Sequence, residues 1–179
     1  MIAIHNSVKA QSTSVLDLSD ILRASLVLVV SALDFYIHEV EVVRLGMLEI
    51  HQGLRPEPPA FSRFQISLAT AREGLKYLED EIRQRHSYKS FQQPDSIADA
   101  IRLISDKKLW LEVANIMGRT DKDIKQELKI IIDRRNKIAH EADIDPTLSL
   151  GNRWAIDEIM VGGAVNFIEQ VVDSIHSII

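Results

Sequence analysis

Three side chains near residue 140 are of the types that can bind a phosphate and transfer a proton. They are Arg135, Asn136 and His140, within the stretch Arg135-Asn136-Lys137-Ile138-Ala139-His140. A guanidinium stays charged at any accessible pH and donates paired hydrogen bonds to phosphate oxygens. An imidazole can act as general acid or base near neutral pH, and an amide can orient it or hold a phosphate oxygen. These groups are sufficient in kind to cleave RNA without a metal ion.

The arginine of this set interrupts the apolar face of a predicted helix. At about 100° per residue, the apolar side chains of the helix lie within roughly 60° of the direction of Arg135. A buried guanidinium is costly unless an anion or a set of carbonyl groups meets it. We therefore expect Arg135 to have a role other than folding stability. The apolar neighbours are Ile124, Leu128, Ile131, Ile132, Ile138 and Ala139.

Arg135 and His140 cannot point in the same direction from one helix. Five residues separate them, which is about 140° around the axis, whereas Asn136 and His140 are four apart and share a face. The arginine and the histidine can converge if the helix ends near His140, or if a second copy of the helix supplies the missing half of the site.

A purely structural explanation accounts for the same residues. His140 would stabilise the carboxyl end of the helix, where an imidazolium meets the helix dipole. Arg135 would pair with a buried acid such as Asp34. Spacing by itself leaves this explanation and the catalytic one open.

Length and composition indicate a single globular domain. The chain has 179 residues, of which 46% are hydrophobic and 26% charged. We predict one domain over residues 17–179, preceded by an amino-terminal segment of residues 1–16. The absence of cysteine excludes disulfides and zinc sites built on thiolates.

Asp34 and His38 are spaced four apart, but no third ligand has suitable spacing, so we predict no metal and no cofactor.

Charge and hydropathy limit the partners that the protein can have. The net charge of -5 argues against a uniformly basic surface for long nucleic acids. From Arg119 to Lys137, seven basic residues stand against four acidic ones, a pattern typical of a solvated helix face with opposite charges. The apolar run Ala24 to Leu33 is too short for the roughly 20 residues of a membrane span. Without an export signal at residues 1–14, we expect a soluble, cytoplasmic protein with no membrane association.

Periodic apolar positions predict an all-α protein, an up-and-down bundle of about five to six helices with a long first helix. The helix that precedes the Arg135 helix should end at Gly118. Thr120 and Asp123 resemble a capping box, which would start the Arg135 helix at Asp121. The predicted helices run from Asp17 or Ser19 to about Ile50, over residues 64–85, from Asp95 or Ser96, from Leu109 to Met117, from Asp121 past His140, and from about Arg153 to the end of the chain.

The motif Arg135-Asn136-x-x-x-His140, late in an all-helical domain, resembles the R-N-x-x-x-H signature of the HEPN superfamily. The RiboL-PSP-HEPN branch is the most similar. Stretches that support the resemblance lie along nearly the whole chain, although only the motif is tied to chemistry. They are residues 31–38 in the first long helix, 91–97 before the third and 153–157 at the start of the last.

The resemblance implies a metal-independent endoribonuclease that acts as a homodimer, with the motif helices of two subunits facing each other. It implies that Arg135 binds the scissile phosphate, that His140 is the acid or base, and that Asn136 is the polar residue after the arginine. Relatives often serve as toxins or in defence against phage, with an antitoxin such as a nucleotidyltransferase as partner. The dimer would pack along the apolar stripe around Arg135. Asp34 is the expected orienting acid for Arg135.

Two departures leave alternatives open. Some superfamily members have a tyrosine two residues after the histidine, where this chain has Ala142. Three acids follow directly after His140, namely Glu141, Asp143 and Asp145. They either stabilise the protonated imidazole or repel RNA. Glu141, the nearest in sequence, is the candidate for supporting His140. The main rival to an endoribonuclease is a HEPN-type module that binds a nucleotide, RNA or protein without cutting.

Overall fold

The computed structural model describes residues 1–12, 17–52, 80, 83–84, 88–102, 104–148 and 151–179. Six helices are named within these ranges, which contain no extended sheet, so the predicted all-α class is confirmed. The helix predicted over residues 64–85 falls mostly outside the described residues. The named helices are α1 (Ile2–Gln11), α2 (Ser19–Gln52), α5 (Pro94–Ile101), α6 (Leu109–Met117), α7 (Asp121–Glu141) and α8 (Glu158–Ile178).

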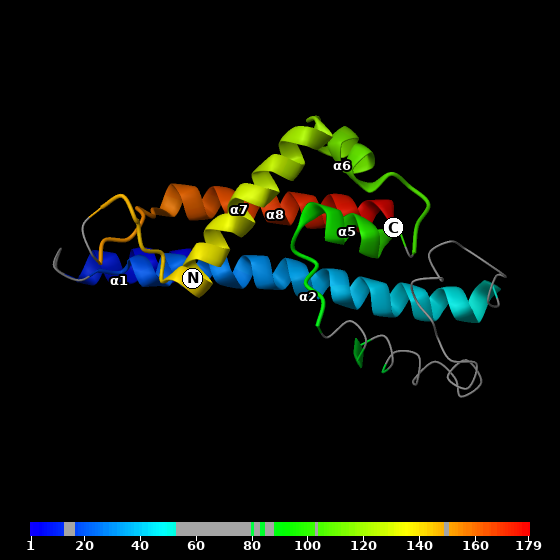
Figure 1. The fold of residues 1–179 in the computed structure, drawn as a ribbon, viewed down its shortest axis with the longest axis horizontal. Coiled ribbons are helices and arrows are strands. Elements are labelled where there is room, and N and C mark those ends of the chain that lie inside the picture. The colour runs from blue at the N-terminus through cyan, green and yellow to red at the C-terminus, as the bar shows by residue number, and fades with distance from the viewer. Residues whose placement is uncertain (13–16, 53–79, 81–82, 85–87, 103, 149–150) are drawn as a thin grey trace.

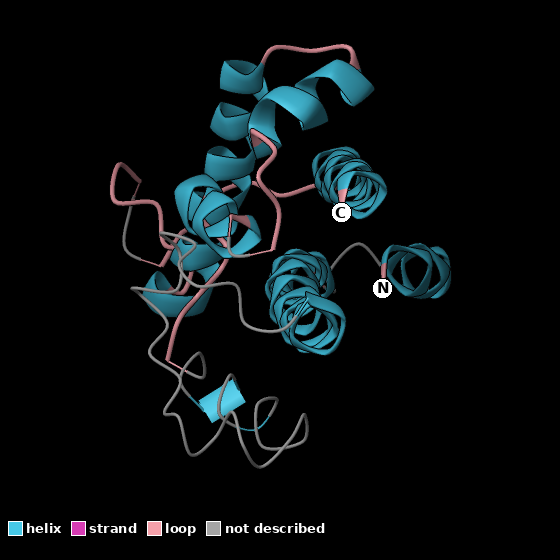
Figure 2. Cartoon of the chain, turned by 90° about the vertical axis from the view of Figure 1, so that its right-hand side faces the viewer, coloured by secondary structure: helices cyan, strands magenta, loops and turns pink. Residues whose placement is uncertain are grey.

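The two parallel helices α2 and α8 form the base of the bundle. Both run from left to right in Figure 1, and the chain returns between them through α5, α6 and α7. The α7 helix crosses α2 obliquely, and α6 packs against both α7 and α8. Figure 2 looks almost along the axes of α1, α2 and α8 and shows α7 on the other side of α2 from α1. The oblique crossing leaves the carboxyl end of α7 near the start of α2.

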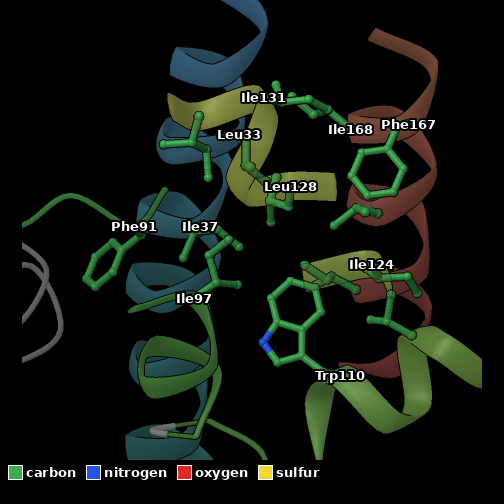
Figure 3. Packing of buried hydrophobic residues seen from close by; sticks show 14 of the residues in the cluster. Leu33, Ile37, Phe91, Ile97, Trp110, Ile124, Leu128, Ile131, Phe167 and Ile168 are labelled. Carbon is green, nitrogen blue, oxygen red and sulfur yellow. The ribbon is translucent and has the colours of Figure 1, made fainter. Parts of the chain in front are cut away.

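One apolar cluster joins all the helices from α2 to α8. The α2 helix contributes Leu26, Val30, Leu33 and Ile37 at helical spacing, all buried. Figure 3 shows Leu33 and Ile37 facing side chains of α7 and α8, with the Trp110 ring closing one end. The indole nitrogen of Trp110 donates to the Pro94 carbonyl at 2.9 Å, which satisfies its polar group inside the core.

The predicted start and stop signals around α6 and α7 are confirmed. Gly118 ends α6 in the left-handed conformation with φ 63°. The Thr120 side chain accepts a hydrogen bond from the backbone N–H of Asp123 at 3.1 Å, so α7 begins at Asp121 as expected. The Asp123 carboxylate accepts from the Thr120 hydroxyl at 2.7 Å instead of reaching the cap backbone, because Asp is shorter than the usual Glu.

Two features of the ends of the chain differ from expectation. Residues 2–11, placed in a segment before the domain, form α1, which packs against α2 and α8 and is tied down by an ion pair of 2.7 Å between Lys9 and Glu158. The last helix begins at Glu158, not near Arg153, because the Asp157 carboxylate accepts from the Met160 backbone N–H at 2.7 Å and caps it there. Ile159 therefore lies in the first turn of α8, where it is 87% exposed.

The apolar run of residues 24–33 lies inside a longer apolar stretch of α2, so the prediction that it falls short of the length of a membrane span is wrong. Over Ser19–Val40 the helix is long and apolar enough, by length and composition, to cross a membrane. Leu22, Leu26, Val30 and Leu33 of this stretch lie in the core and Arg23 is buried, whereas Leu28 and Phe35 are exposed. These buried side chains belong to the core of the same chain.

Candidate functional site

The predicted apolar face of α7 is buried along the first three turns of the helix and becomes partly exposed at the motif. Ile124, Leu128 and Ile132 lie in the core of the same chain. Arg135 is half-buried, and Ala139 is exposed. The expectation that this whole stripe packs against a second subunit is therefore wrong for its buried part, because the oblique crossing of α2 covers it. Of this face, only the carboxyl-terminal turns of α7 remain accessible.

Arg135 carries a charge that no acid among the described residues neutralises. Its Nη1 atom donates to the Oδ1 atom of Asn136 at 3.0 Å. Its Nε atom is buried and donates no hydrogen bond within the described part of the chain. No carboxylate of that part lies within 4.0 Å of the guanidinium to form an ion pair. An anion arriving from outside would supply the missing acceptor.

The expected orienting acid, Asp34, lies elsewhere. One of its oxygens accepts from the backbone N–H of Phe91 at 2.6 Å, and the other accepts from the Gln92 side chain at 3.2 Å. His38 stands 3.8 Å from the same carboxylate and packs its ring against Phe91. Within the described residues, Asp34 therefore fastens the segment before α5 to α2, and it forms no bond with Arg135.

The neighbouring arginine, Arg134, has the buried pairing that sequence reasoning considered for Arg135. Its Nη2 atom donates to Asp143 at 2.9 Å, and Nε of Arg23 donates to the same carboxylate oxygen at 2.7 Å. Asp143 is fully buried. Burial lowers the pKa of the Arg134 guanidinium, and the negative charge of Asp143 opposes that shift. We call Arg23, Arg134 and Asp143 the Asp143 cluster.

The Asp143 cluster fixes the end of α7 just after His140. Ala142 and Asp143 both have positive φ, 51° and 58°, a conformation that costs a non-glycine residue roughly 1–2 kcal/mol. The backbone N–H of Asp143 donates to the Lys137 carbonyl, and the Asp143 carbonyl accepts from Trp154 at 3.0 Å. These bonds and the two arginines hold the turn in place. The position of the family tyrosine, Ala142, is the capping residue of this turn.

His140 lies exposed in the last turn of α7, and no hydrogen bond or ion pair engages it within the described residues. Of the three acids after it, Asp143 and Asp145 are buried and turned inward. The Asp145 carboxylate accepts from the backbone and hydroxyl of Thr147 at 2.9 and 2.7 Å. Glu141 alone of the three is exposed. The acids that seemed to crowd the histidine are therefore largely removed from it.

The structure places Arg135, Asn136 and His140 on one accessible helix end, but it does not make Arg135 and His140 converge. The helix continues regularly to Glu141, so the two remain about 140° apart and about 7.5 Å apart along the axis. Sequence reasoning missed Arg23 and the Asp143 cluster, since the arginine and the aspartate are 120 residues apart and no local pattern links them. Within the described residues, no three His, Asp or Glu side chains are grouped to hold a metal ion.

Comparison with known proteins gives one match. The family model described as RiboL-PSP-HEPN matches residues 1–179, the whole chain. No curated protein and no solved structure matches it. The motif residues, the all-helical fold and the match over the full length agree, and the chain belongs to the RiboL-PSP-HEPN family.

Proposed function

We propose that this protein is a metal-independent endoribonuclease in which Arg135 binds the scissile phosphate and His140 transfers a proton. The observation that carries this proposal is the contrast between two adjacent arginines. Both arginines have a buried Nε without an acceptor, but Arg134 pairs with Asp143 at 2.9 Å, whereas Arg135 has no acid within 4.0 Å among the described residues. A guanidinium held in this way suits an anionic ligand better than a structural ion pair.

The chemistry is an attack of the ribose 2′-hydroxyl on the adjacent phosphorus. The 2′-oxygen forms a bond to phosphorus, the bond to the 5′-oxygen breaks, and a proton passes from the first oxygen to the second. His140 is the acid or base of this transfer, since its imidazole is exposed and unengaged within the described part of α7. Arg135 stabilises the negative charge that gathers on the phosphate oxygens, and Asn136 holds its guanidinium at 3.0 Å.

The proposed site needs a second subunit. Arg135 and His140 of one helix diverge, so the arginine of one subunit and the histidine of its partner complete one site. The accessible carboxyl end of α7 is where the two helices meet. Further apolar contact comes from a stripe on α2, away from the core, formed by Leu28, Ala32 and Phe35, of which Leu28 is 55% and Phe35 66% exposed. A homodimer covers this stripe from water.

The test is cleavage of single-stranded RNA by the purified protein in the presence of EDTA. We expect 2′,3′-cyclic phosphate and 5′-hydroxyl ends, and a loss of about 10²- to 10⁴-fold in rate for His140→Ala. Asn166→Ala, at an exposed position of α8 away from the motif, is the control and should cut at the wild-type rate. Cleavage by His140→Ala at the wild-type rate would refute the assignment.

The second candidate is a HEPN module that binds RNA, a nucleotide or a protein without cutting. The net charge of -5 and the alanine at position 142 favour it. It predicts RNA binding that depends on Arg135 but no cleavage under any condition, and His140→Ala would then leave binding unchanged.

We also propose a biological setting on the basis of the family. The protein acts in the cytoplasm as a toxin or phage-defence effector, restrained by an antitoxin such as a nucleotidyltransferase. Growth arrest upon expression of the wild type, but not of His140→Ala, would support it. Equal growth with both would count against a toxin.

A further inference from the structure

The face of α7 that carries His140 also carries a row of basic and polar side chains. Lys122, Lys129 and Asn136 are seven residues apart, and His140 follows four residues later. At about 100° per residue, successive members of this row differ in direction by no more than about 40°. With a rise of 1.5 Å per residue, the row is about 27 Å long from Lys122 to His140. We call these four residues the α7 row.

The lysines of the row differ from the other basic residues at the start of α7. Lys125 pairs with Asp121 at 2.8 Å, and Arg119 pairs with Glu127 at 2.7 Å. Lys122 and Lys129 are exposed and form no ion pair within the described residues. The first turns of this helix, where the sequence predicts a solvated face with opposite charges, therefore hold both paired basic residues and the two unpaired ammonium groups of Lys122 and Lys129.

We propose that the α7 row binds the sugar-phosphate backbone of single-stranded RNA on one side of the scissile phosphate. This inference rests on the proposed function, because His140 fixes where the cleaved bond lies. Ammonium groups on flexible, exposed side chains contact phosphates without reading bases. The row is longer than a dinucleotide, so the substrate is an RNA several nucleotides long. Asp133, exposed on the same face, is the acid that weakens this contact.

The row also explains how a chain with a net charge of -5 attracts a polyanion. Attraction over a few ångströms depends on the local charge, because salt screens charges that lie more than about 8–10 Å away. The two free lysines lie along the path that leads to His140, whereas the acids Asp143 and Asp145 at the end of the helix are buried. Two ammonium groups therefore face the carboxylate of Asp133 along the row, a local excess of positive charge on an acidic protein.

The experiment compares Lys122→Gln, Lys129→Gln and Asp133→Asn with the wild type on a dinucleotide and on a twelve-nucleotide RNA. Each lysine variant should raise KM for the longer RNA about two- to fivefold and much less for the dinucleotide. Each should also reduce the slope of log affinity against log salt by about 0.7. Asp133→Asn should lower KM for the longer RNA. Lys89→Gln removes the same charge from an exposed position outside α7 and is the control, with KM unchanged.

The outcomes separate this inference from the proposed function. If the wild type cuts the longer RNA and the lysine variants have its KM and salt slope, the row is not the RNA path, although the enzyme assignment stands. If the wild type cuts neither substrate, fluorescence anisotropy with the labelled twelve-nucleotide RNA tests the row directly. Weaker binding by the lysine variants and tighter binding by Asp133→Asn then support it. Unchanged binding, or no binding by the wild type, overturns it.

Discussion

Arg134 donates to the Asp143 carboxylate at 2.9 Å, and this bond ties the motif helix to the loop that follows it. Arg23 of α2 donates to the same oxygen at 2.7 Å. One buried carboxylate thus joins the end of α7 to the start of α2 and fixes the turn three residues after His140. Arg135, the next residue, has no such partner among the described acids and is left for a ligand.

Replacing Asp143 should destabilise the protein more than any exposed substitution near the motif. Asp143→Ala leaves the buried Arg23 with only the exposed Asp20, 3.7 Å from its Nη1, as counter-charge, which costs up to about 3–5 kcal/mol. Urea denaturation followed by circular dichroism measures the loss. Glu141→Ala, two residues earlier and exposed, should change the free energy of unfolding by no more than about 0.5 kcal/mol. Equal stability of the two variants would contradict the structural role of the Asp143 cluster.

Arg135→Ala should abolish activity without a comparable loss of stability. The side chain forms no ion pair in the described structure, so its removal breaks only the contact of 3.0 Å with Asn136. We expect the cleavage rate to fall about 10²- to 10³-fold. Arg134→Ala is the matched variant and should instead lower the melting temperature. If Arg135→Ala destabilised the protein while the molecules that remain folded kept full activity, Arg135 would be the structural arginine and not the phosphate ligand.

Asp34→Ala should weaken the fold and leave the chemistry intact. The substitution removes the acceptor of the Phe91 backbone N–H and of the Gln92 side chain, a loss of about 1–3 kcal/mol. The cleavage rate per folded molecule should stay at the wild-type value, because Asp34 does not touch Arg135 within the described residues. If Asp34→Ala lowered kcat strongly without lowering stability, Asp34 would instead belong to the catalytic site.

Phe35→Asp should dissociate the proposed dimer while the subunit stays folded. Phe35 is 66% exposed on α2, so a carboxylate there is solvated in the monomer but would be buried in a subunit interface. Sedimentation velocity should show a monomer, with circular dichroism unchanged and cleavage lost. Ile159→Asp, at a position 87% exposed in the first turn of α8, is the control and should remain dimeric. A monomeric but active variant would show that one subunit suffices.

The sequence by itself determined the local elements and the identity of the motif. Gly118 and Thr120 placed the boundary between α6 and α7, because a left-handed cap and a side-chain cap depend on residues within a few positions of one another. The spacing of apolar residues identified the long helix α2 and the buried turns of α7. The types and order of Arg135, Asn136 and His140 pointed to phosphate and proton chemistry.

Tertiary structure decided which charges are free. The pairing of Arg23 with Asp143 spans 120 residues, and the bond from Phe91 to Asp34 spans 57. Helical periodicity reports only the angle of a side chain around its own axis, not which helix crosses at that point. It therefore predicted a continuous seam along α7, whereas the oblique contact with α2 buries the first turns and exposes the last. That crossing neutralises Arg134, leaves Arg135 without an acid in the described structure, and presents His140 to solvent.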